Sequence, residues 1–583
     1  MNLETLSCSE ASQHVASIRQ INMLWCERII NTLVSLGVRN AIICPGGRSA
    51  AMALVMNECP QISTLTHTDE RSASFMALGM ARATRSPVLV CTTSGSAAAN
   101  LLPAATEAEK SRLPLVVLTC QRIFADVNNE APQVADHMRI LAAGMKAACD
   151  LPAPTTVEDD LNRLSDYVRQ LAPFMVNFPL RGPVHLNVSL YGSFTSLDTI
   201  PPGDIAACEW KPVIKSELDA VPTNVLPTVE SLVESLGLKS GMKGLIIAGC
   251  ESTLTHVQMA ELVEMTGFPI LADAMSGYRR PAVSDNLVCS ADLMALHPAI
   301  QSLRADIIIR TGLAPCSHTI HSFLKNQNCP TLKIGSNKVF TDFTGLQCYP
   351  IPAKDKDIRQ LGAIFSHGDA HWKNTWVERS KALADKLSGL QSVLPWGELV
   401  AADIICNTEG FAFFHLANSM SARHGNIFCR ASTIDQPIYG NRGLNGIDGT
   451  LGTFFGELLA RKAPGLLMLG DLSLIHDLPA LEAVKQKRLN GCICVMNNNG
   501  GGLFSIITKD VPQYDATMRN PVPINLSGIA SAFDMNFRSC DSPEGLRQAL
   551  SFARRTPNVT LIDIRVPYNS LALGIDKIMK VLF

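Results

Sequence analysis

Two short segments of the chain carry side chains that could bind a metal ion. Gly470-Asp471-Leu472-Ser473 follows an apolar run at residues 465–469, and the Asn-Asn-Asn-Gly-Gly-Gly segment at 497–502 follows a second apolar run. If these runs are neighbouring strands of a parallel sheet, the side chains of Asp471 and Asn498 lie at the same edge. A carboxylate, an amide oxygen and a backbone carbonyl suit Mg²⁺, whose other ligands are commonly phosphate oxygens. The glycines would let the backbone approach a phosphate closely.

Each segment taken alone has a simpler interpretation. Gly-Asp is a common turn, and Asn-Gly is the strongest short signal for a hairpin. Between the two segments, however, apolar residues recur at helical spacing: Leu474, Leu478, Leu481 and Val484. The region therefore predicts a strand–helix–strand unit, whose crossover is right-handed in nearly every known case. The presence of both segments at the strand ends of one unit favours a binding site over two unrelated turns.

The elements that would position these residues are those of parallel sheets covered by helices. A first region has apolar runs at residues 41–44, 87–91 and 114–118, with a helical pattern at 72–83. A second region has apolar runs at 245–248, 269–272 and 306–309, and the third contains 465–469 and 492–496. Continuous apolar strands between helices indicate parallel sheets buried on both faces. Residues 195–227, rich in Pro, Gly and polar residues, predict a linker. We therefore predict the α/β class, with three doubly wound parallel-sheet domains at residues 1–200, 201–375 and 376–583.

Composition limits the classes of function. The 583 residues are 47% hydrophobic, which excludes a largely disordered chain, and 50 basic against 52 acidic residues give a net charge of -2. This balance gives no electrostatic reason to expect a nucleic acid or a membrane as partner. Residues 1–20 are polar and lack the apolar core of a signal peptide, and no run reaches the roughly 18 apolar residues of a membrane span.

The cysteines point to the same kind of protein. The chain has 18 cysteines and no C-x-x-C pair, so we expect buried thiols in a reducing compartment rather than disulfides or metal ligands. Cys492 and Cys494 alternate in one apolar run and should share a strand face. Together these features predict a cytoplasmic protein.

The two metal-binding segments resemble the motif of the thiamine-diphosphate-dependent enzymes. That motif begins with Gly-Asp and ends with Asn, and here the separation is 498 − 471 = 27 residues. The resemblance implies that Asp471, Asn498 and the carbonyl of Gly500 hold Mg²⁺ on the cofactor's diphosphate. It also implies that Glu70 bonds N1′ of the aminopyrimidine. A carboxyl group in an apolar pocket stays protonated more readily and can share a proton with that nitrogen. The alternative for Glu70 is a carboxylate that stabilises the start of a helix.

A narrower resemblance covers the chain from about residue 45 to residue 504. It rests on these segments: 45–49, 67–71, 92–97 with Asn100, 441–443, 446–449, 470–473 and 497–504. They are similar to the 2-succinyl-5-enolpyruvyl-6-hydroxy-3-cyclohexene-1-carboxylate synthases of menaquinone biosynthesis. The resemblance implies pyrimidine-binding, central and diphosphate-binding domains. It also implies a homodimer or a dimer of dimers, with each cofactor bound between two chains.

The same resemblance assigns further residues to the site. Ile447 matches the bulky residue that holds the cofactor bent. Other residues that would contact the cofactor are Ser94, Gly95, Asn100, Gly470, Leu472 and Ser473. Arginine offers carboxylates a bidentate fork, and the residues that would bind the acidic substrates are Arg48, Arg122, Gln133, Ser419, Arg423, Arg442, Leu503 and Phe504. An arginine taken singly can instead form an ordinary ion pair.

The chain departs from the family's pattern in three places. Gly47 replaces a serine, and Pro132 replaces the asparagine that precedes Gln133. Residues 316–319, Cys-Ser-His-Thr, stand where a lysine-containing acceptor-binding stretch is expected, and Lys325 is close but not at the matching place. Each lost hydroxyl, amide or ammonium would weaken carboxylate recognition by about 1–3 kcal/mol. The cofactor machinery is therefore better supported than the acceptor.

The resemblance implies a reaction that depends on thiamine diphosphate and Mg²⁺. In it, 2-oxoglutarate is decarboxylated and the succinyl-semialdehyde carbanion adds in 1,4 fashion to isochorismate. A related carboligase with the same or a similar 2-oxo acid donor and another acceptor would account for Gly47, Pro132 and His318. A cofactor-free structural or regulatory homologue is disfavoured by the presence of Glu70 and the metal motif. A nicotinamide dehydrogenase is disfavoured because no apolar run ends in G-x-G-x-x-G.

Overall fold

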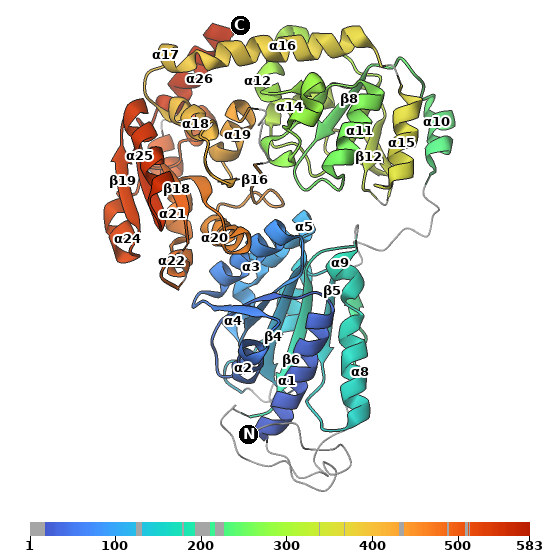
Figure 1. Cartoon of the computed structure of the whole chain (residues 1–583), viewed down its shortest axis with the longest axis vertical. Helices are drawn as coiled ribbons and strands as arrows, with labels where there is room; N and C mark the ends of the chain where they lie inside the picture. Colours follow the sequence, from blue (N-terminus) through green and yellow to red (C-terminus); the bar gives the residue numbers. More distant parts are fainter. Residues whose placement is uncertain are drawn as a thin grey trace. The chain divides into compact units, whose positions relative to one another are not determined.

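The computed structural model describes residues 18–123, 131–177, 180–192, 210–215, 227–336, 338–366, 368–430, 436–486, 489–507, 511 and 513–582. These residues form three mostly parallel sheets with helices between successive strands (Figure 1). The chain divides into two compact units. The first consists of residues 1–220, 451–461 and 477–486, and the second of residues 221–450, 462–476 and 487–583. The predicted α/β class with three parallel-sheet regions is confirmed, whereas the predicted domain boundaries stay predictions.

The first unit is built on a seven-stranded sheet in the order β2-β1-β3-β4-β6-β5-β7. Its strands are β1 (Asn40–Ile43), β2 (Ser63–Thr66), β3 (Val88–Thr92), β4 (Leu115–Arg122), β5 (Ala147–Leu151), β6 (Val184–Leu190) and β7 (Ile214–Lys215). Neighbouring strands run parallel except β5 and β7. The central strands β3 and β6 are buried along their whole length, which explains their continuous apolar sequence.

Helices cover this sheet. They are α1 (Ile18–Ser35), α2 (Ala50–Glu58), α3 (Glu70–Thr84), α4 (Ser96–Asn100), α5 (Leu102–Ser111), α7 (His137–Leu141), α8 (Glu158–Arg169) and α9 (Ala172–Val176). One hydrophobic core joins Trp25 of α1, Met52 of α2 and Leu164 of α8 to strand residues such as Leu89 and Leu118. The predicted helix at 72–83 lies within α3.

A tight helix contact completes the first unit. Helix α20 (Thr450–Arg461) packs against α3 through glycines on both helices. A Cβ atom at Gly79 would lie 2.0 Å from the carbonyl oxygen of Thr453, and one at Gly456 would lie 2.0 Å from that of Met76. Only glycine allows two helix backbones to approach this closely.

The second unit contains two sheets. One has seven strands in the order β10-β9-β8-β11-β12-β14-β13. Its strands are β8 (Gly244–Ala248), β9 (Ile270–Ala272), β10 (Leu287–Val288), β11 (Ile307–Thr311), β12 (Thr331–Ile334), β13 (Phe340–Thr341) and β14 (Gln347–Ile351). Its helices are α10 (Val229–Leu236), α11 (His256–Thr266), α12 (Ala291–Met294), α13 (Pro298–Gln301), α14 (His318–Lys325), α15 (Asp355–Ile364) and α16 (Ala370–Ser388). Apolar residues of α10, α11 and α15 form one core with this sheet.

The other sheet has six strands in the order β16-β15-β17-β18-β20-β19, and every neighbouring pair is parallel. Its strands are β15 (Phe413–Leu416), β16 (Ile438–Tyr439), β17 (Gly465–Gly470), β18 (Gly491–Asn497), β19 (Asn536–Cys540) and β20 (Val559–Arg565). Its helices are α17 (Leu390–Val393), α18 (Glu398–Cys406), α19 (Met420–Phe428), α21 (Asp471–His476), α23 (Phe504–Ile507), α24 (Leu526–Ala532), α25 (Pro543–Arg555) and α26 (Ser570–Leu582). Helix α22 (Glu482–Gln486), between β17 and β18 in the chain, belongs to the first unit.

The crossover from β17 to β18 differs from the expectation. The leucine spacing predicts one helix, but the segment consists of α21, a 3-10 turn at Leu478–Leu481, and α22. Pro479 cannot continue a preceding helix because it lacks a backbone N–H. The buried side chain of Asp477 accepts a hydrogen bond from the backbone N–H of Gly452 at 3.0 Å. The break therefore carries residues 477–486 into the first unit, while both flanking strands stay in the second.

Several smaller predictions can also be compared with the structure. Most of the predicted linker lies outside the described residues, and its described part includes the short strand β7. The described cysteines are free thiols, and the sulfur atoms of Cys492 and Cys494 lie 3.7 Å apart on one face of β18, as expected. No helix in the described part of the chain is long and apolar enough to cross a membrane.

Candidate active site

Five residues predicted for the site lie at the carboxyl ends of strands in the first unit. Arg48 follows β1, Glu70 follows β2, Ser94 and Gly95 follow β3, and Arg122 ends β4. Because β2, β1, β3 and β4 are successive neighbours in the sheet, these residues share one edge. In open α/β sheets this is the edge at which ligands bind.

Glu70 is the first residue of α3 and is partly exposed. Its Oε2 atom accepts a hydrogen bond from Nδ2 of Asn100 at 3.1 Å, so two residues predicted to contact the cofactor lie together. The preceding residue, Asp69, caps the helix by accepting a hydrogen bond from the N–H of Ser72 at 2.7 Å. The capping role therefore belongs to Asp69, and the carboxylate of Glu70 faces Asn100.

The turn before Glu70 is held by a residue that the sequence analysis missed. Glu482 of α22 accepts hydrogen bonds from the backbone N–H of Thr68 at 3.1 Å and from its hydroxyl at 3.2 Å. Its carboxylate also lies 3.7 Å from Nδ1 of His67. His67 is fully buried, and burial lowers the pKa of its imidazole although the nearby carboxylates oppose that shift. Thr68 and Glu482 are 414 residues apart, so no spacing in the sequence could reveal the contact.

The loops after β3 and β4 also meet. The contact is made by Gln133, whose Nε2 atom donates a hydrogen bond to the carbonyl oxygen of Ser94 at 3.3 Å. The N–H of Gly95 donates to Nε2 of His137 at 3.3 Å. Gly95 has a φ of 85°, and a Cβ atom there would lie 3.0 Å from Cγ of Gln133, so this position requires glycine. The structure thus brings together Ser94, Gly95 and Gln133.

The loop after β1 packs against the loop after β3. The N–H of Arg48 donates to Oγ1 of Thr93 at 3.3 Å, and the Arg48 guanidinium donates to the carbonyl oxygen of Gly192. A Cβ atom at Gly47, where the family's pattern has serine, would meet no atom within 4 Å. The missing hydroxyl therefore leaves open space beside Arg48.

The second unit carries the residues of the predicted metal motif. Asp471 begins α21 directly after β17, Asn498 follows β18, and the two strands pair in parallel as predicted. The buried carboxylate of Asp471 accepts hydrogen bonds from the N–H of Gly500 at 2.9 Å and from that of Leu472 at 2.8 Å. Burial raises the pKa of the Asp471 carboxyl, and these hydrogen bonds oppose the shift. The structure therefore joins Asp471 to the glycine-rich loop.

Asn498 is buried and its two amide atoms have different surroundings. Nδ2 donates to Oε2 of Glu398 at 3.1 Å. Oδ1 is buried and has no hydrogen-bond partner among the described residues. A buried amide oxygen without a partner is unfavourable unless another group satisfies it.

Asp471 and two residues of the glycine-rich loop together fit a magnesium ion. The carboxylate of Asp471, Oδ1 of Asn498 and the carbonyl of Gly500 are hard oxygen donors of the kind Mg²⁺ prefers. In the described part of the chain, no group of three or more His, Cys, Asp and Glu side chains could hold a metal. Asn499 and Gly500 have φ values of 59° and 125°, so the backbone turns sharply at this point. Such turns form concave anion sites from backbone N–H groups.

A buried asparagine that the sequence analysis missed organises the neighbouring loops. Nδ2 of Asn418 donates to the carbonyl oxygens of Asn441 and Gly446 at 2.7 and 2.5 Å, and Oδ1 accepts from Nη1 of Arg442 at 2.6 Å. Arg423 of α19 donates from Nη1 to the carbonyl oxygen of Ser419 at 2.6 Å. Ser419, Arg423 and Arg442 are thereby placed at the carboxyl ends of β15 and β16.

The remaining predicted residues occupy the same edge of the third sheet. Ile447 lies in the loop after β16, and its carbonyl oxygen accepts a hydrogen bond from Oγ1 of Thr450 at 3.2 Å. Ser473 is buried in the first turn of α21, which follows Gly470. Leu503 and Phe504 follow the glycine-rich loop, and both are partly buried.

The stretch where the family's lysine is expected contains Cys316, on which the charges of Arg423 and Arg442, two residues predicted to bind substrate, act. Burial raises the pKa of the Cys316 thiol to about 12, while the charges of Arg442 and Arg423 oppose that shift. Cys316 therefore lies within electrostatic reach of both guanidinium groups. Lys325 is the last residue of α14, seven residues from its start, which is about 10 Å along the helix axis. It does not take the place of the missing lysine.

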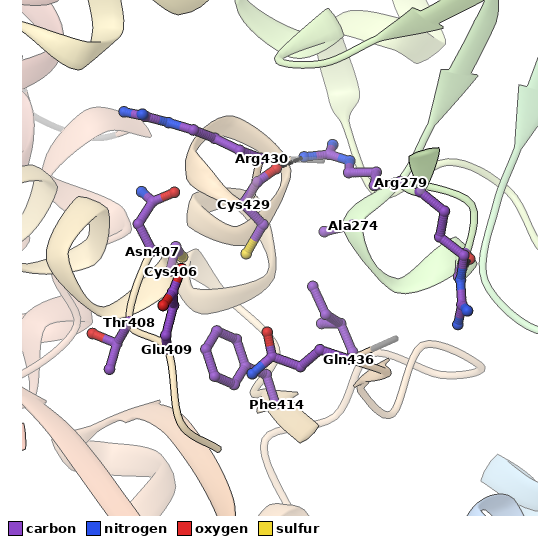
Figure 2. Close-up of a pocket in the computed structure, with 13 residues that line it drawn as sticks. Ala274, Arg279, Cys406, Asn407, Thr408, Glu409, Phe414, Cys429, Arg430 and Gln436 are labelled. Carbon is purple, nitrogen blue, oxygen red and sulfur yellow. Dashed lines mark hydrogen bonds between the residues drawn. The ribbon is translucent and has the colours of Figure 1, made fainter. Parts of the chain in front are cut away.

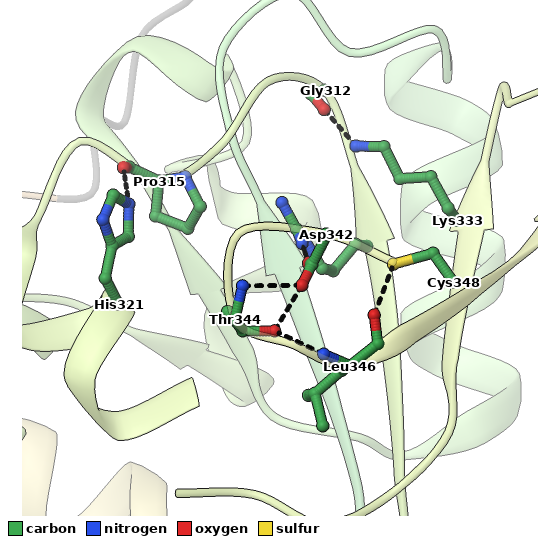
Figure 3. A network of polar contacts seen from close by, with 9 residues as sticks. Gly312, Pro315, His321, Lys333, Asp342, Thr344, Leu346 and Cys348 are labelled. Carbon is green, nitrogen blue, oxygen red and sulfur yellow. Dashed lines mark hydrogen bonds and ion pairs between the residues drawn. The ribbon is translucent and has the colours of Figure 1, made fainter. Parts of the chain in front are cut away.

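Polar contacts hold the turn before this stretch (Figure 3). The ammonium of Lys333, on β12, donates to the carbonyl oxygen of Gly312. Nε2 of His321 lies 2.6 Å from the carbonyl oxygen of Pro315. These contacts fix the segment that leads from β11 to Cys316.

A cavity of about 480 Å³ in the second unit lies apart from the predicted residues. Figure 2 shows its lining, which includes the thiols of Cys406 and Cys429 and the side chains of Arg279 and Arg430. A hydrogen bond from Cys406 and the charge of Arg279 lower the pKa of the Cys429 thiol. None of the residues predicted for the site lines this cavity.

Known protein families match the two regions of the chain that carry most of these residues. A family described as the N-terminal TPP binding domain of thiamine pyrophosphate enzymes matches residues 25–140, and the C-terminal TPP binding domain matches residues 428–564. A 2-succinyl-5-enolpyruvyl-6-hydroxy-3-cyclohexene-1-carboxylate synthase of Bacillus cytotoxicus is 32% identical over 84% of this chain and 83% of its own. A synthase of the same name from Listeria monocytogenes is 30% identical over 92% of this chain and 93% of its own. The chain belongs to this synthase family. Chloroflexus aurantiacus has another such relative, 29% identical over 93% of each chain.

Membership of the synthase family confirms two predictions. The chain is an enzyme that depends on thiamine diphosphate. Glu70 and Gln133 fall inside the first matched range, and Asp471 and Asn498 fall inside the second. The roles of individual residues stay predictions.

Proposed function

We propose that the chain catalyses the reaction for which its relatives are named, with 2-oxoglutarate as donor and isochorismate as acceptor. The observations that carry the proposal are the buried Oδ1 of Asn498, which has no hydrogen-bond partner among the described residues, and the Asp471–Gly500 hydrogen bond. It supports a metal–diphosphate site at the edge where β17 and β18 end. The names of the relatives supply the reaction.

The roles of the cofactor residues follow from their positions. Asp471, Asn498 and the Gly500 carbonyl would hold Mg²⁺ on the diphosphate. Thiamine diphosphate, when bound, supplies the thiazolium carbon at which the 2-oxo acid reacts. Glu70, oriented by its hydrogen bond from Asn100, would hold a proton at N1′ of the aminopyrimidine. Ile447 would keep the cofactor bent.

Both proposed substrates carry carboxylates, and the chain offers arginines for them. Arg423 and Arg442 lie at one sheet edge of the second unit, and Arg48 and Arg122 lie at the edge of the first. Nη1 of Arg442 donates a hydrogen bond to Oδ1 of Asn418, and this bond orients the rest of the guanidinium. A planar guanidinium fixed in this way is preorganised to bind a carboxylate with two hydrogen bonds.

The proposed assembly is a homodimer or a dimer of dimers, with each cofactor held between the first unit of one chain and the second unit of another. A cytoplasmic location stays a prediction from the sequence, which cell fractionation would test. Small-molecule acids are the expected partners of the site.

A second candidate is a carboligase that keeps the 2-oxo acid donor and uses another acceptor. It is favoured by Cys316, which lies near Arg423 and Arg442 where a lysine is expected, and by the open space at Gly47. Product analysis with a panel of aldehydes and unsaturated acids would distinguish the two candidates.

The decisive experiment measures CO₂ release from 2-oxoglutarate by the purified protein with thiamine diphosphate and Mg²⁺, with and without isochorismate. The proposal expects release to quicken with isochorismate and isochorismate to be consumed. Release that is indifferent to isochorismate would support the second candidate. No release in either tube would contradict the donor assignment.

A further inference from the structure

Glu398 is a buried carboxylate that no sequence motif singled out. It begins α18, and only 3% of it is exposed. Oε2 accepts a hydrogen bond from Nδ2 of Asn498 at 3.1 Å, and Oε1 lies 2.9 Å from Nε2 of His424. Each carboxylate oxygen therefore has a side-chain partner, as a charge removed from water requires.

This contact determines how the Asn498 amide is oriented. A side-chain amide can turn its oxygen or its nitrogen toward a neighbour, but an ionised carboxylate only accepts hydrogen bonds. The nitrogen of Asn498 must therefore face Glu398, and Oδ1 points the other way. Oδ1 is the buried oxygen without a described partner, and it is the atom that a hard cation would bind.

The surroundings of Glu398 hold its own position. Its backbone N–H donates to Oγ of Ser570 at 3.2 Å, which fixes the start of α18. Gly502 leaves the room for the amide, because a Cβ atom there would lie 2.3 Å from Nδ2 of Asn498. His424, from α19, holds the second oxygen. Helices α18, α19 and α26, together with the glycine-rich loop, thus fix one orientation of the Asn498 amide.

We propose that Glu398 is a positioning residue that holds the Asn498 amide with its oxygen toward the magnesium ion. The inference rests on the magnesium site proposed above. Partners in this outer layer orient the direct ligands of a metal, and their loss typically weakens metal binding 10–100-fold.

The test is a calorimetric titration of Mg²⁺ into the full-length protein at saturating thiamine diphosphate. The variant Glu398→Ala removes both acceptors and leaves the amide free to rotate. We expect Mg²⁺ affinity to fall about 10–100-fold. Glu398→Gln keeps one oxygen that can accept from Asn498, so we expect it to restore affinity to within about threefold of the wild type. The matched control is Glu264→Ala, at an exposed position in α11.

The outcomes separate positioning from simple structural support. The melting temperature of each variant without metal and cofactor reports the structural contribution of Glu398. Wild-type affinity in Glu398→Ala would overturn the proposal, as would an equal loss in the Gln and Ala variants. If Glu398→Ala does not fold, Glu398→Asp, whose shorter side chain draws back from Asn498, is expected to weaken Mg²⁺ binding at least about fivefold.

The failure of this inference can be told apart from the failure of the proposed function. A wild-type protein that does not bind Mg²⁺ in the presence of thiamine diphosphate contradicts the metal site itself. A wild-type protein that binds Mg²⁺, with binding lost in Asp471→Ala but retained in Glu398→Ala, contradicts only the role of Glu398.

Discussion

Glu70 occupies the first position of α3, where its carboxylate meets Asn100 and the capping is done by Asp69. Its expected role needs a carboxyl group that can share a proton, which an amide cannot do. We therefore expect Glu70→Gln to bind thiamine diphosphate nearly as the wild type does but to exchange the cofactor's C2 proton about a hundredfold or more slowly. Exchange followed by proton NMR measures this directly. An unchanged rate would remove Glu70 from the mechanism.

Asp471 connects the end of β17 to the glycine-rich loop through the N–H of Gly500. Replacing it with alanine removes the only carboxylate among the proposed metal ligands. We expect Asp471→Ala to lose Mg²⁺-dependent binding of thiamine diphosphate, measured by calorimetric titration. The exposed Asp541, changed to alanine, serves as the control. Affinity close to that of the wild type in Asp471→Ala would contradict the metal assignment.

Some residues of the candidate site could be predicted from the sequence, and others could not. Asp471 and Asn498 could be found because each directly follows an apolar strand, and the ends of parallel neighbours meet at one edge. Glu398 lies 100 residues before Asn498, and its partner His424 lies on a different helix. Contacts of this kind depend on how elements pack, so they could not be predicted from local spacing.

Among the elements, strands were predicted more reliably than the crossover between β17 and β18. Strands of a sheet buried on both faces are continuous apolar runs, and β3, β8 and β18 lie where those runs occur. The crossover has helical spacing of leucines, but Pro479 and the buried Asp477 break it. Periodicity reports which face is apolar and does not report where a helix is interrupted.

The glycines between α3 and α20 give an element-scale prediction. A Cβ atom at Gly456 would lie 2.0 Å from the carbonyl oxygen of Met76, which is backbone and cannot move aside. We expect Gly456→Ala to lower the free energy of unfolding by about 1–3 kcal/mol, since overpacking forces the helices apart. Urea unfolding measures the change. Gly389→Ala is the control because a Cβ atom there would lie 3.6 Å from the nearest atom, the carbonyl oxygen of Lys386. Equal stability of the two variants would contradict the close contact between α3 and α20.

The buried imidazole of His185 on β6 predicts how stability depends on pH. Its Nε2 lies 2.8 Å from Oγ1 of Thr119, and burial lowers its pKa from 6.5 to about 3. As the pH falls below 6.5, the unfolded chain takes up a proton that the folded protein does not. Each unit by which the pH falls below about 6.5 therefore lowers the free energy of unfolding by up to about 1.4 kcal/mol through His185.

Urea unfolding at about pH 7.5 and about pH 5 tests this dependence, which is expected to be weaker in His185→Gln. The exposed His371, changed to glutamine, is the control. The same loss of stability on acidification in wild type and His185→Gln would show that another group is responsible.

On the scale of the whole molecule, the proposed assembly makes a prediction about mixed subunits. Glu70 belongs to the first unit and Asp471 to the second. If each site combines the first unit of one chain with the second unit of another, a mixed dimer of Glu70→Gln and Asp471→Ala has one intact site. Co-expression of the two inactive variants should then restore about a quarter of wild-type activity, because half of random dimers are mixed. No recovery in dimers shown to be mixed would contradict a shared site.

The route of the chain has a consequence for any attempt to divide the protein. The chain passes between the two units five times, because residues 451–461 and 477–486 belong to the first unit and their flanking residues to the second. A gene fragment that ends at residue 220 would encode the whole first sheet. It would lack α20, whose glycines pack on α3, and Glu482, which holds the turn before Glu70. The region that presents Glu70 is therefore not a transferable module, and recombination at residue 220 would strip it of its supports.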